Sequence, residues 1–238
     1  MRPINRGNSP QVYTDYKNAK PDLVDRLGTY CSFCERRIPT NLAVEHIFPK
    51  DDNLPYAHLR NEWNNFLLSC VNCNSAKGTQ IISTSNYLLP DRDNTFPYFD
   101  YQENGMVEVF EGNYDDDIVE MAQKVISLVN LNLNNHPNWN DSIMFSAIER
   151  IGQRVQAWVQ AKDALQDYID GYTIPRRIAA EAAATGFFSI WMSAFEGHIE
   201  VRKEIIENFS GTALDCFDTN TDPIYPRPSN GLENSGKA

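Results

Sequence analysis

Apolar residues recur at helical spacing through much of the second half of the chain. In the segment 139–171 they fall three, four or seven positions apart, at Met144, Ile148, Ile151, Val155, Trp158 and Leu165. This spacing predicts one long amphipathic helix, capped at its start by Asp141 and ended by Gly171. Similar periodicity over 115–130, 175–195 and 198–209 predicts further helices, and therefore a bundle of about four.

The first half is patterned differently. Pro3, Gly7 and Pro10 favour an extended arm, and the lead-in after it is expected to end at Gly28. Alternation in "VEHIFPK", residues 44–50, predicts a short strand. Short strands such as "GMVEVFE" are expected among the loops of 81–114, and the tail is expected to be extended or disordered.

These patterns predict an α+β protein divided into five regions. They are an N-terminal arm and lead-in (1–29), a metal-organised module (30–80), a loop-rich connection (81–114), a helical region (115–210) and an extended tail (211–238). With 42% apolar and 22% charged residues the chain has the composition of a globular protein. The sequence shows neither a signal peptide nor a run long enough to span a bilayer, so we expect a cytoplasmic protein without a membrane partner.

Four of the five cysteines form two C-x-x-C pairs, Cys31 with Cys34 and Cys70 with Cys73. In a reducing compartment such pairs are typical of metal ligands. Together they supply the four tetrahedral ligands of a structural Zn²⁺, with no position left open for catalysis. The alternative is a set of reduced cysteines in the core.

An acid and a histidine, Glu45 and His46, lie inside the gap between the two cysteine pairs. A lone histidine beside apolar residues is usually a partly buried structural one. Here, however, zinc would fix both ends of the segment that carries it. Asn65 precedes Cys70 by five residues, and "CNSAKG" places Asn74 directly after Cys73.

The order C-x2-C, E-H-I, N-x4-C and C-x2-C-N-x2-K over residues 30–78 resembles the HNH endonuclease family. The opening "RPINRG", the phrase "YCSFCERRI" and the ending "FSGTALDCFD" are similar to HNH nucleases of Septu-type and retron-associated antiphage systems. The resemblance implies a zinc-stabilised ββα-metal core followed by a mainly helical region. It also implies hydrolysis of phosphodiester bonds in nucleic acid, with DNA favoured over RNA.

The resemblance further implies a role for each motif residue. His46 would be the general base, because a neutral imidazole accepts a proton near pH 7. Glu45 and Asn74 would hold a catalytic Mg²⁺ or Mn²⁺ through hard oxygen ligands. Asn65 would brace the loop and orient the imidazole. Asn74 stands where the family name has a final His, which favours hard metals over nickel or zinc as the catalytic ion.

Charge is distributed unevenly along the chain, and this affects which partners the protein can bind. Residues 1–80 hold ten Lys and Arg against eight Asp and Glu, whereas the rest of the chain holds 11 against 24. The candidate phosphate ligands are therefore confined to the first third, and each could equally be a solvated charge; they are Arg36, Arg37, Lys50 and Lys77. A nucleic-acid substrate would need a second chain to help hold it. The resembled systems imply an ATPase of the ABC or SMC type in that place.

An aromatic stripe in the helical region, formed by Phe187, Trp191 and Phe195, is either bundle core or a surface for such a partner.

Three functions remain open from the sequence. The first is a metal-dependent HNH endonuclease that acts as effector of an ATPase-containing antiphage complex. The second is a nuclease of the same family that cleaves RNA such as tRNA. This alternative stays open because the core motif acts on the phosphate and does not distinguish the sugar of DNA from that of RNA. The third is a zinc-ribbon binding module without catalysis, which would have no need of Glu45, His46, Asn65 and Asn74.

Overall fold

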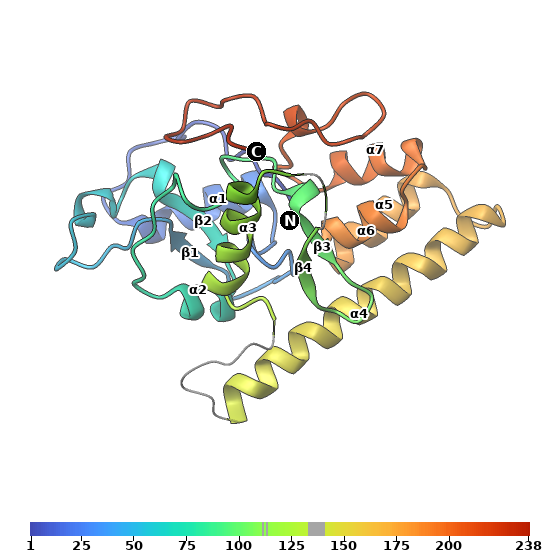
Figure 1. Ribbon diagram of the computed structural model, residues 1–238, viewed down its shortest axis with the longest axis horizontal. Coiled ribbons are helices and arrows are strands. Elements are labelled where there is room, and N and C mark those ends of the chain that lie inside the picture. Colours follow the sequence, from blue (N-terminus) through green and yellow to red (C-terminus); the bar gives the residue numbers. More distant parts are fainter. Residues whose placement is uncertain (111, 113, 133–140) are drawn as a thin grey trace.

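The first half of the protein is built around one antiparallel strand pair and the helix that follows it. In the computed structural model, which describes residues 1–110, 112, 114–132 and 141–238, strand β1 (Ala43–His46) pairs with β2 (Phe66–Ser69). The register sets Ala43 opposite Ser69 and His46 opposite Phe66. Helix α2 (Val71–Lys77) starts directly after β2. Helix α1 (Lys20–Leu27) packs against β2 (Figure 1).

Helix α1 ends at Gly28, as the sequence predicts. Gly28 has φ +74°, and a Cβ there would lie 2.6 Å from a ring carbon of Tyr30. Only glycine adopts this left-handed conformation at no steric cost, so the residue stops the helix and admits the Tyr30 ring.

A second strand pair and a helix form the middle of the chain. Strands β3 (Phe99–Tyr101) and β4 (Val107–Val109) are antiparallel, and helix α3 (Asp116–Leu128) packs on β4. Both elements agree with the prediction of short strands and of a helix over 115–130. In Figure 1 the strand pair lies beside the long helix α4 (Asp141–Ile169), between the first half and the remaining helices.

Helix α4 confirms the predicted long helix but not its predicted buried face. Among the α4 side chains that the structure describes, from Ala147 onward, the buried positions are small or positively charged residues: Ala147, Arg150, Arg154, Ala157, Ala161 and Ala164. The predicted apolar stripe lies at the edge of this face, and Ile148 is 51% exposed. Alanine allows close approach of the neighbouring helix α6 (Phe188–Ala194). The side chain of Met144 and the capping partners of Asp141 lie outside the described residues.

The predicted C-terminal stop of α4 is confirmed in detail. Gly171 has φ +79°, its N–H donates to the Tyr168 carbonyl at 3.1 Å, and Tyr172 N–H donates to the Asp167 carbonyl at 2.8 Å. These two bonds are the Schellman pattern, which satisfies the free carbonyl groups of the last turn.

The helix predicted over 175–195 is two helices, α5 (Pro175–Thr185) and α6. They are separated by Gly186 (φ +84°) and Phe187 (φ +59°), the left-handed N-cap of α6. A Cβ on Gly186 would lie 2.7 Å from the Arg37 backbone nitrogen. The break lies where the stretch 35–37, directly after Cys34, packs against Gly186 and Phe187, a long-range contact that helical periodicity does not report.

The aromatic stripe is core. Phe187, Trp191 and Phe195 are 3%, 0% and 0% exposed, so they do not form a surface for a partner. Helix α7 (Ile199–Asn208) packs on α5 and α6 and closes this core. The last helix predicted, over 198–209, is thereby confirmed. None of the helices within the described residues is long and apolar enough to cross a membrane.

Candidate active site and metal centre

The four paired cysteines meet at one point. Their Sγ atoms all lie within 4.8 Å of one another, and all four residues are buried. Cys31 and Cys34 come from a tight turn whose ends are joined by a Cys31 N–H bond to the Arg36 carbonyl at 3.0 Å. Cys70 is the N-cap of α2 and Cys73 lies in its first turn. The sequence spacing therefore predicts this cluster correctly.

The chemistry of the cluster fits a bound cation. Burial raises the pKa of the Cys31 thiol well above its usual range, whereas hydrogen bonding with Cys31 lowers the pKa of Cys34 and Cys70. Buried thiols without a cation cannot all ionise together, because each thiolate opposes the next. Four sulfur donors at this separation suit tetrahedral Zn²⁺.

His46 ends strand β1 and lies at the wall of a cleft. Its ring is 5% exposed and packs edge-on against Tyr16 and Phe66, with centroids 4.8 and 5.3 Å away. His46 Nε2 lies 2.9 Å from the Arg60 carbonyl oxygen. A carbonyl only accepts, so Nε2 carries the proton and Nδ1 is left with the lone pair. Burial lowers the pKa of His46 to about 4, which keeps the imidazole neutral near pH 7.

Asn65 fixes the loop between the two strands. Its Oδ1 accepts from Phe48 N–H at 2.7 Å, and its Nδ2 donates to the Phe48 and Leu59 carbonyls at 3.0 and 3.1 Å. Because Leu59 adjoins Arg60, the amide also holds the stretch whose carbonyl orients His46. Asn65 thus acts on the imidazole through the backbone and not by direct contact.

Glu45 is buried and already paired. It is 2% exposed, and its Oε1 lies 3.0 Å from Lys77 Nζ, a group that also donates to the His46 carbonyl at 2.6 Å. Burial raises the pKa of Glu45, and the nearby Lys77 charge opposes that rise.

The cleft beside His46 has a volume of about 460 Å³ and brings together most of the motif. It is lined by Glu45, His46, Pro49, Lys50, Asp51, Asp52, Asn53, Arg60, Asn74, Gly78 and Thr79. Asn74 is half-buried, and within the described part of the chain its side chain has no hydrogen-bond partner. A free amide oxygen on a cleft shared with a carboxylate fits a hard divalent cation such as Mg²⁺ or Mn²⁺, so Glu45 and Asn74 are the two residues that could hold one here.

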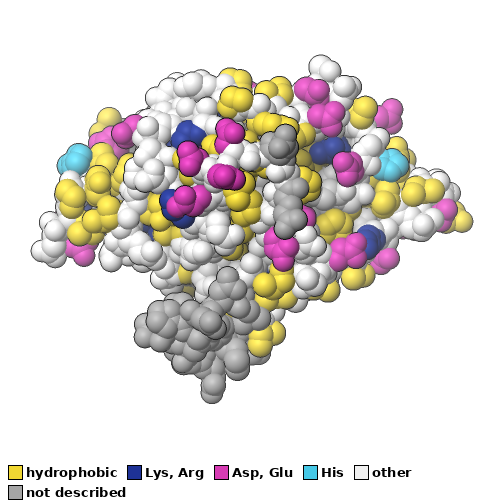
Figure 2. All heavy atoms as spheres, viewed as in Figure 1, with side chains coloured by type: hydrophobic (Ala, Val, Ile, Leu, Met, Phe, Trp, Pro, Cys, Tyr) yellow, Lys and Arg dark blue, Asp and Glu magenta, His cyan; other side chains and the backbone are white. Residues whose placement is uncertain are grey.

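Of the four candidate phosphate ligands, only Lys50 lines this cleft. Its Nζ donates to Tyr16 Oη at 2.9 Å. Arg36 donates to the Asn72 amide at 2.8 Å, and Arg37, although exposed, reaches the Ala184 carbonyl at 3.4 Å. Both belong to a different cleft, against α4 and α5. Lys77 is 1% exposed. On the face shown in Figure 2, Lys and Arg side chains are few and scattered among Asp and Glu.

Sequence reasoning missed the residue that joins the cysteine turn to the helices. Glu35, 2% exposed, accepts from Ser189 N–H at 2.8 Å and from Ser189 Oγ at 2.6 Å, at the start of α6. It also accepts from the Arg2 backbone N–H. From the sequence, a charged residue inside "CERR" is expected to be exposed to solvent, and the local pattern contains no signal that Glu35 is buried.

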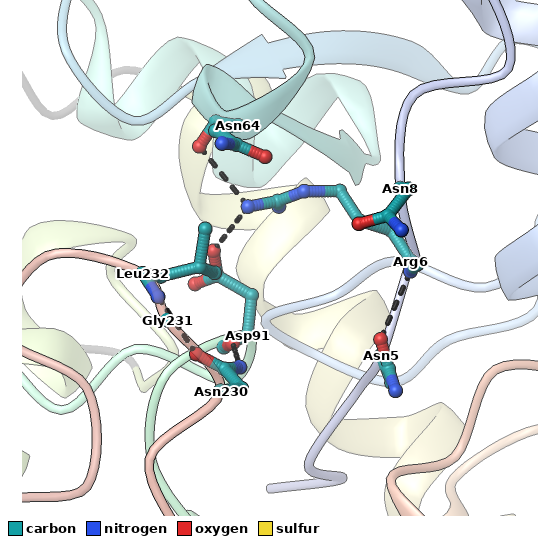
Figure 3. Close-up of a pocket in the computed structure, with 9 residues that line it drawn as sticks. Asn5, Arg6, Asn8, Asn64, Asp91, Asn230, Gly231 and Leu232 are labelled. Atoms are coloured by element: carbon teal, nitrogen blue, oxygen red, sulfur yellow. Dashed lines mark hydrogen bonds and ion pairs between the residues drawn. The ribbon is translucent and has the colours of Figure 1, made fainter.

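The N-terminal arm supports β2 from the side of a second cleft, of about 410 Å³ (Figure 3). Arg6, 3% exposed, donates to the carbonyls of Phe66 at 2.5 Å and Asn64 at 3.0 Å and pairs with Asp91 at 2.7 Å. Asn230, from the tail, donates to the Asp91 carbonyl at 2.7 Å. The arm has little regular structure, whereas the tail contains the short 3-10 helix Leu214–Cys216 followed by turns and bends, and both segments contact the rest of the protein.

Comparison with known proteins agrees with this geometry. Residues 30–80 match the family model of the HNH endonucleases. The match contains both cysteine pairs, both strands β1 and β2, and α2. The protein thus carries an HNH endonuclease domain whose four cysteines are placed to bind a metal. No curated protein matches the chain.

Proposed function

We propose that the protein is a metal-dependent HNH endonuclease that hydrolyses phosphodiester bonds, with DNA as the favoured substrate. One observation carries the proposal. Within the region that matches the family, the Arg60 carbonyl fixes the tautomer of His46 and leaves Nδ1 as the proton acceptor, on a cleft shared with Glu45 and Asn74.

The side chains around the cleft support each step of hydrolysis. A water in the cleft would lose its proton to His46 Nδ1 while its oxygen bonds to phosphorus and the bond to the leaving oxygen breaks. Asn65 and the Arg60 carbonyl keep the imidazole in one orientation. A divalent cation held by Glu45 and Asn74 would stabilise the charge on the phosphate and on the leaving oxygen. The Cys31, Cys34, Cys70 and Cys73 zinc would be structural.

We further propose that the chain works with a second protein. The acidic balance of residues 81–238 opposes binding to phosphates, and Lys50 and Arg60 are the only cationic side chains among the described residues that line the cleft. The sequence resemblance to antiphage HNH nucleases suggests an ATPase of the ABC or SMC type as that partner. Because the aromatic stripe is core, such a partner would have to contact other surfaces.

A matched pair of variants tests the nuclease. His46→Ala should lose at least roughly 10²-fold in cleavage of plasmid DNA with Mg²⁺, the usual loss for a general base. His58→Ala removes an exposed histidine from the connection between β1 and β2 and should cleave as the wild type does. Total tRNA, assayed in parallel, separates a DNA from an RNA substrate. Equal cleavage by His46→Ala and wild type would refute the assignment, and binding without any cleavage would favour the zinc-ribbon module.

A further inference from the structure

Lys77 is a buried cation at the position where the catalytic ion is expected. It is 1% exposed, and its Nζ contacts Glu45 Oε1 at 3.0 Å and the His46 carbonyl at 2.6 Å. Both contacts reach from the last turn of α2 to the end of β1. A carboxylate and a carbonyl oxygen are also donors that hard divalent ions prefer.

The helix geometry explains how Lys77 reaches this place. Cys73 and Lys77 are four residues apart and therefore share one face of α2, the face that is buried against the strands. Asn74, three residues before Lys77, lies one turn away and lines the cleft. Lys77 thus contacts Glu45 from the same helix that places Asn74 on the cleft shared with Glu45, so α2 supplies both a positive charge and an amide oxygen.

We propose that Lys77 competes with the catalytic cation: its ammonium group neutralises Glu45 in the metal-free protein and leaves the carboxylate when a divalent ion binds. The inference rests on the proposed function, because it takes Glu45 and Asn74 as ligands of that ion.

Electrostatics gives the direction of the effect. A buried carboxylate needs a nearby cation, and Lys77 supplies one before the metal arrives. Once a divalent ion binds Glu45, it and the ammonium group repel each other at short range. Lys77 therefore stabilises the metal-free fold and weakens metal binding. An opposite charge within about 4–6 Å stabilises a carboxylate by the equivalent of roughly 1–3 pK units, and a divalent ion must displace that interaction to bind Glu45, so we expect removal of the Lys77 charge to raise metal affinity at least about tenfold.

The principal test compares Mn²⁺ binding to zinc-loaded wild type, Lys77→Met and Lys50→Met, by calorimetry or by electron paramagnetic resonance of free Mn²⁺ at pH 8. Lys77→Met keeps the apolar stem and should bind Mn²⁺ at least about tenfold more tightly. The metal-free form of Lys77→Met should melt at a lower temperature than metal-free wild type. Saturating Mn²⁺ should reduce this difference in melting temperature. Lys50 lines the same cleft but bonds to Tyr16, so its replacement should change Mn²⁺ affinity much less.

A double variant checks the cause. Glu45→Gln in the Lys77→Met background removes both charges, and should regain metal-free stability while losing the gain in Mn²⁺ affinity. Unchanged or weaker Mn²⁺ binding by folded Lys77→Met would overturn the proposal.

A second measurement uses the wild-type chain, in case Lys77→Met does not fold. Acetylation of Lys77 by acetic anhydride, read by mass spectrometry against the exposed Lys124 and Lys162, should be slow without metal and faster with saturating Mn²⁺. An unchanged rate overturns the proposal. Tighter Mn²⁺ binding by Lys77→Met without any cleavage by wild type would uphold the competition and reject the nuclease. Cleavage by wild type that is lost in His46→Ala, together with unchanged Mn²⁺ affinity in Lys77→Met, would uphold the nuclease and reject the competition.

Discussion

The lowered pKa of His46 makes the stability of the protein depend on pH in a defined window. Burial moves the pKa from its ordinary value of 6.5 to about 4 in the folded chain. The neutral imidazole is therefore favoured by folding. The resulting stabilisation is fully present above pH 6.5 and is lost as pH falls towards 4.

The size of the effect follows from the shift. About 2.5 pK units at 1.36 kcal/mol each give roughly 3 kcal/mol below pH 4. Between pH 7.5 and pH 5 the same two pKa values give a loss of about 2 kcal/mol. Glu45 acts in the opposite sense, because burial raises its pKa and protonation at lower pH favours the folded state. A comparison of variants is needed to separate the two groups.

Urea unfolding at pH 7.5 and at pH 5, with zinc content checked at both, measures this contribution. His46→Gln keeps an amide donor for the Arg60 carbonyl and removes the titration, so wild type should lose about 2 kcal/mol more than this variant between the two pH values. His58→Gln, which alters an exposed ring, should behave as wild type does. If the free energy of unfolding of His46→Gln and of wild type changed equally between pH 7.5 and pH 5, His46 would not be held neutral by burial.

Two further predictions concern the scaffold. Cys73→Ser, or removal of zinc by a strong chelator, should unfold the region around β1 and α2, because structural zinc contributes on the order of 10 kcal/mol in small zinc-organised peptides. Elemental analysis measures the zinc content and circular dichroism the loss of structure. Folded protein purified without zinc would contradict this prediction. Arg6→Met should lower the free energy of unfolding by roughly 3 kcal/mol, because it leaves the buried Asp91 with only Arg92 as a charged partner. Denaturant titration measures this, and Arg26→Met, which replaces an exposed arginine, is a control that should change stability little.

Local signals predicted the elements that local physics controls. Gly28 and Gly171 end their helices because the backbone needs φ above zero there. The alternation around Val44 predicted β1, and the cysteine spacing predicted the cluster. Failures came where distant segments meet. The buried face of α4 and the break at Gly186 depend on neighbours that periodicity does not contain.

The same division holds within the site. Motif order was enough to bring Glu45, His46 and Asn74 to one cleft. It was not enough for Lys77, for which the sequence left open a phosphate ligand or a solvated charge, and which is instead buried and paired with Glu45. Which way a lysine on a short helix points is decided by the packing of that helix on the strands. The Arg60 carbonyl was missed for a related reason, because a backbone acceptor has no signature in a side-chain motif.

The strands that carry the site are too short to hold it alone. Each has four residues, and an isolated two-stranded hairpin is marginally stable at best in water. Helix α2 is fixed at both ends instead, by Cys70 and Cys73 at its start and by Lys77 bonded to β1 at its end. Asn74 lies between these two attachments. In the metal-free protein the cysteine cluster and the Lys77 pair therefore hold α2 on β1 together. A divalent ion bound by Glu45 and Asn74 would join the same two elements in place of the Lys77 ammonium group, so the site keeps its geometry when Lys77 leaves Glu45.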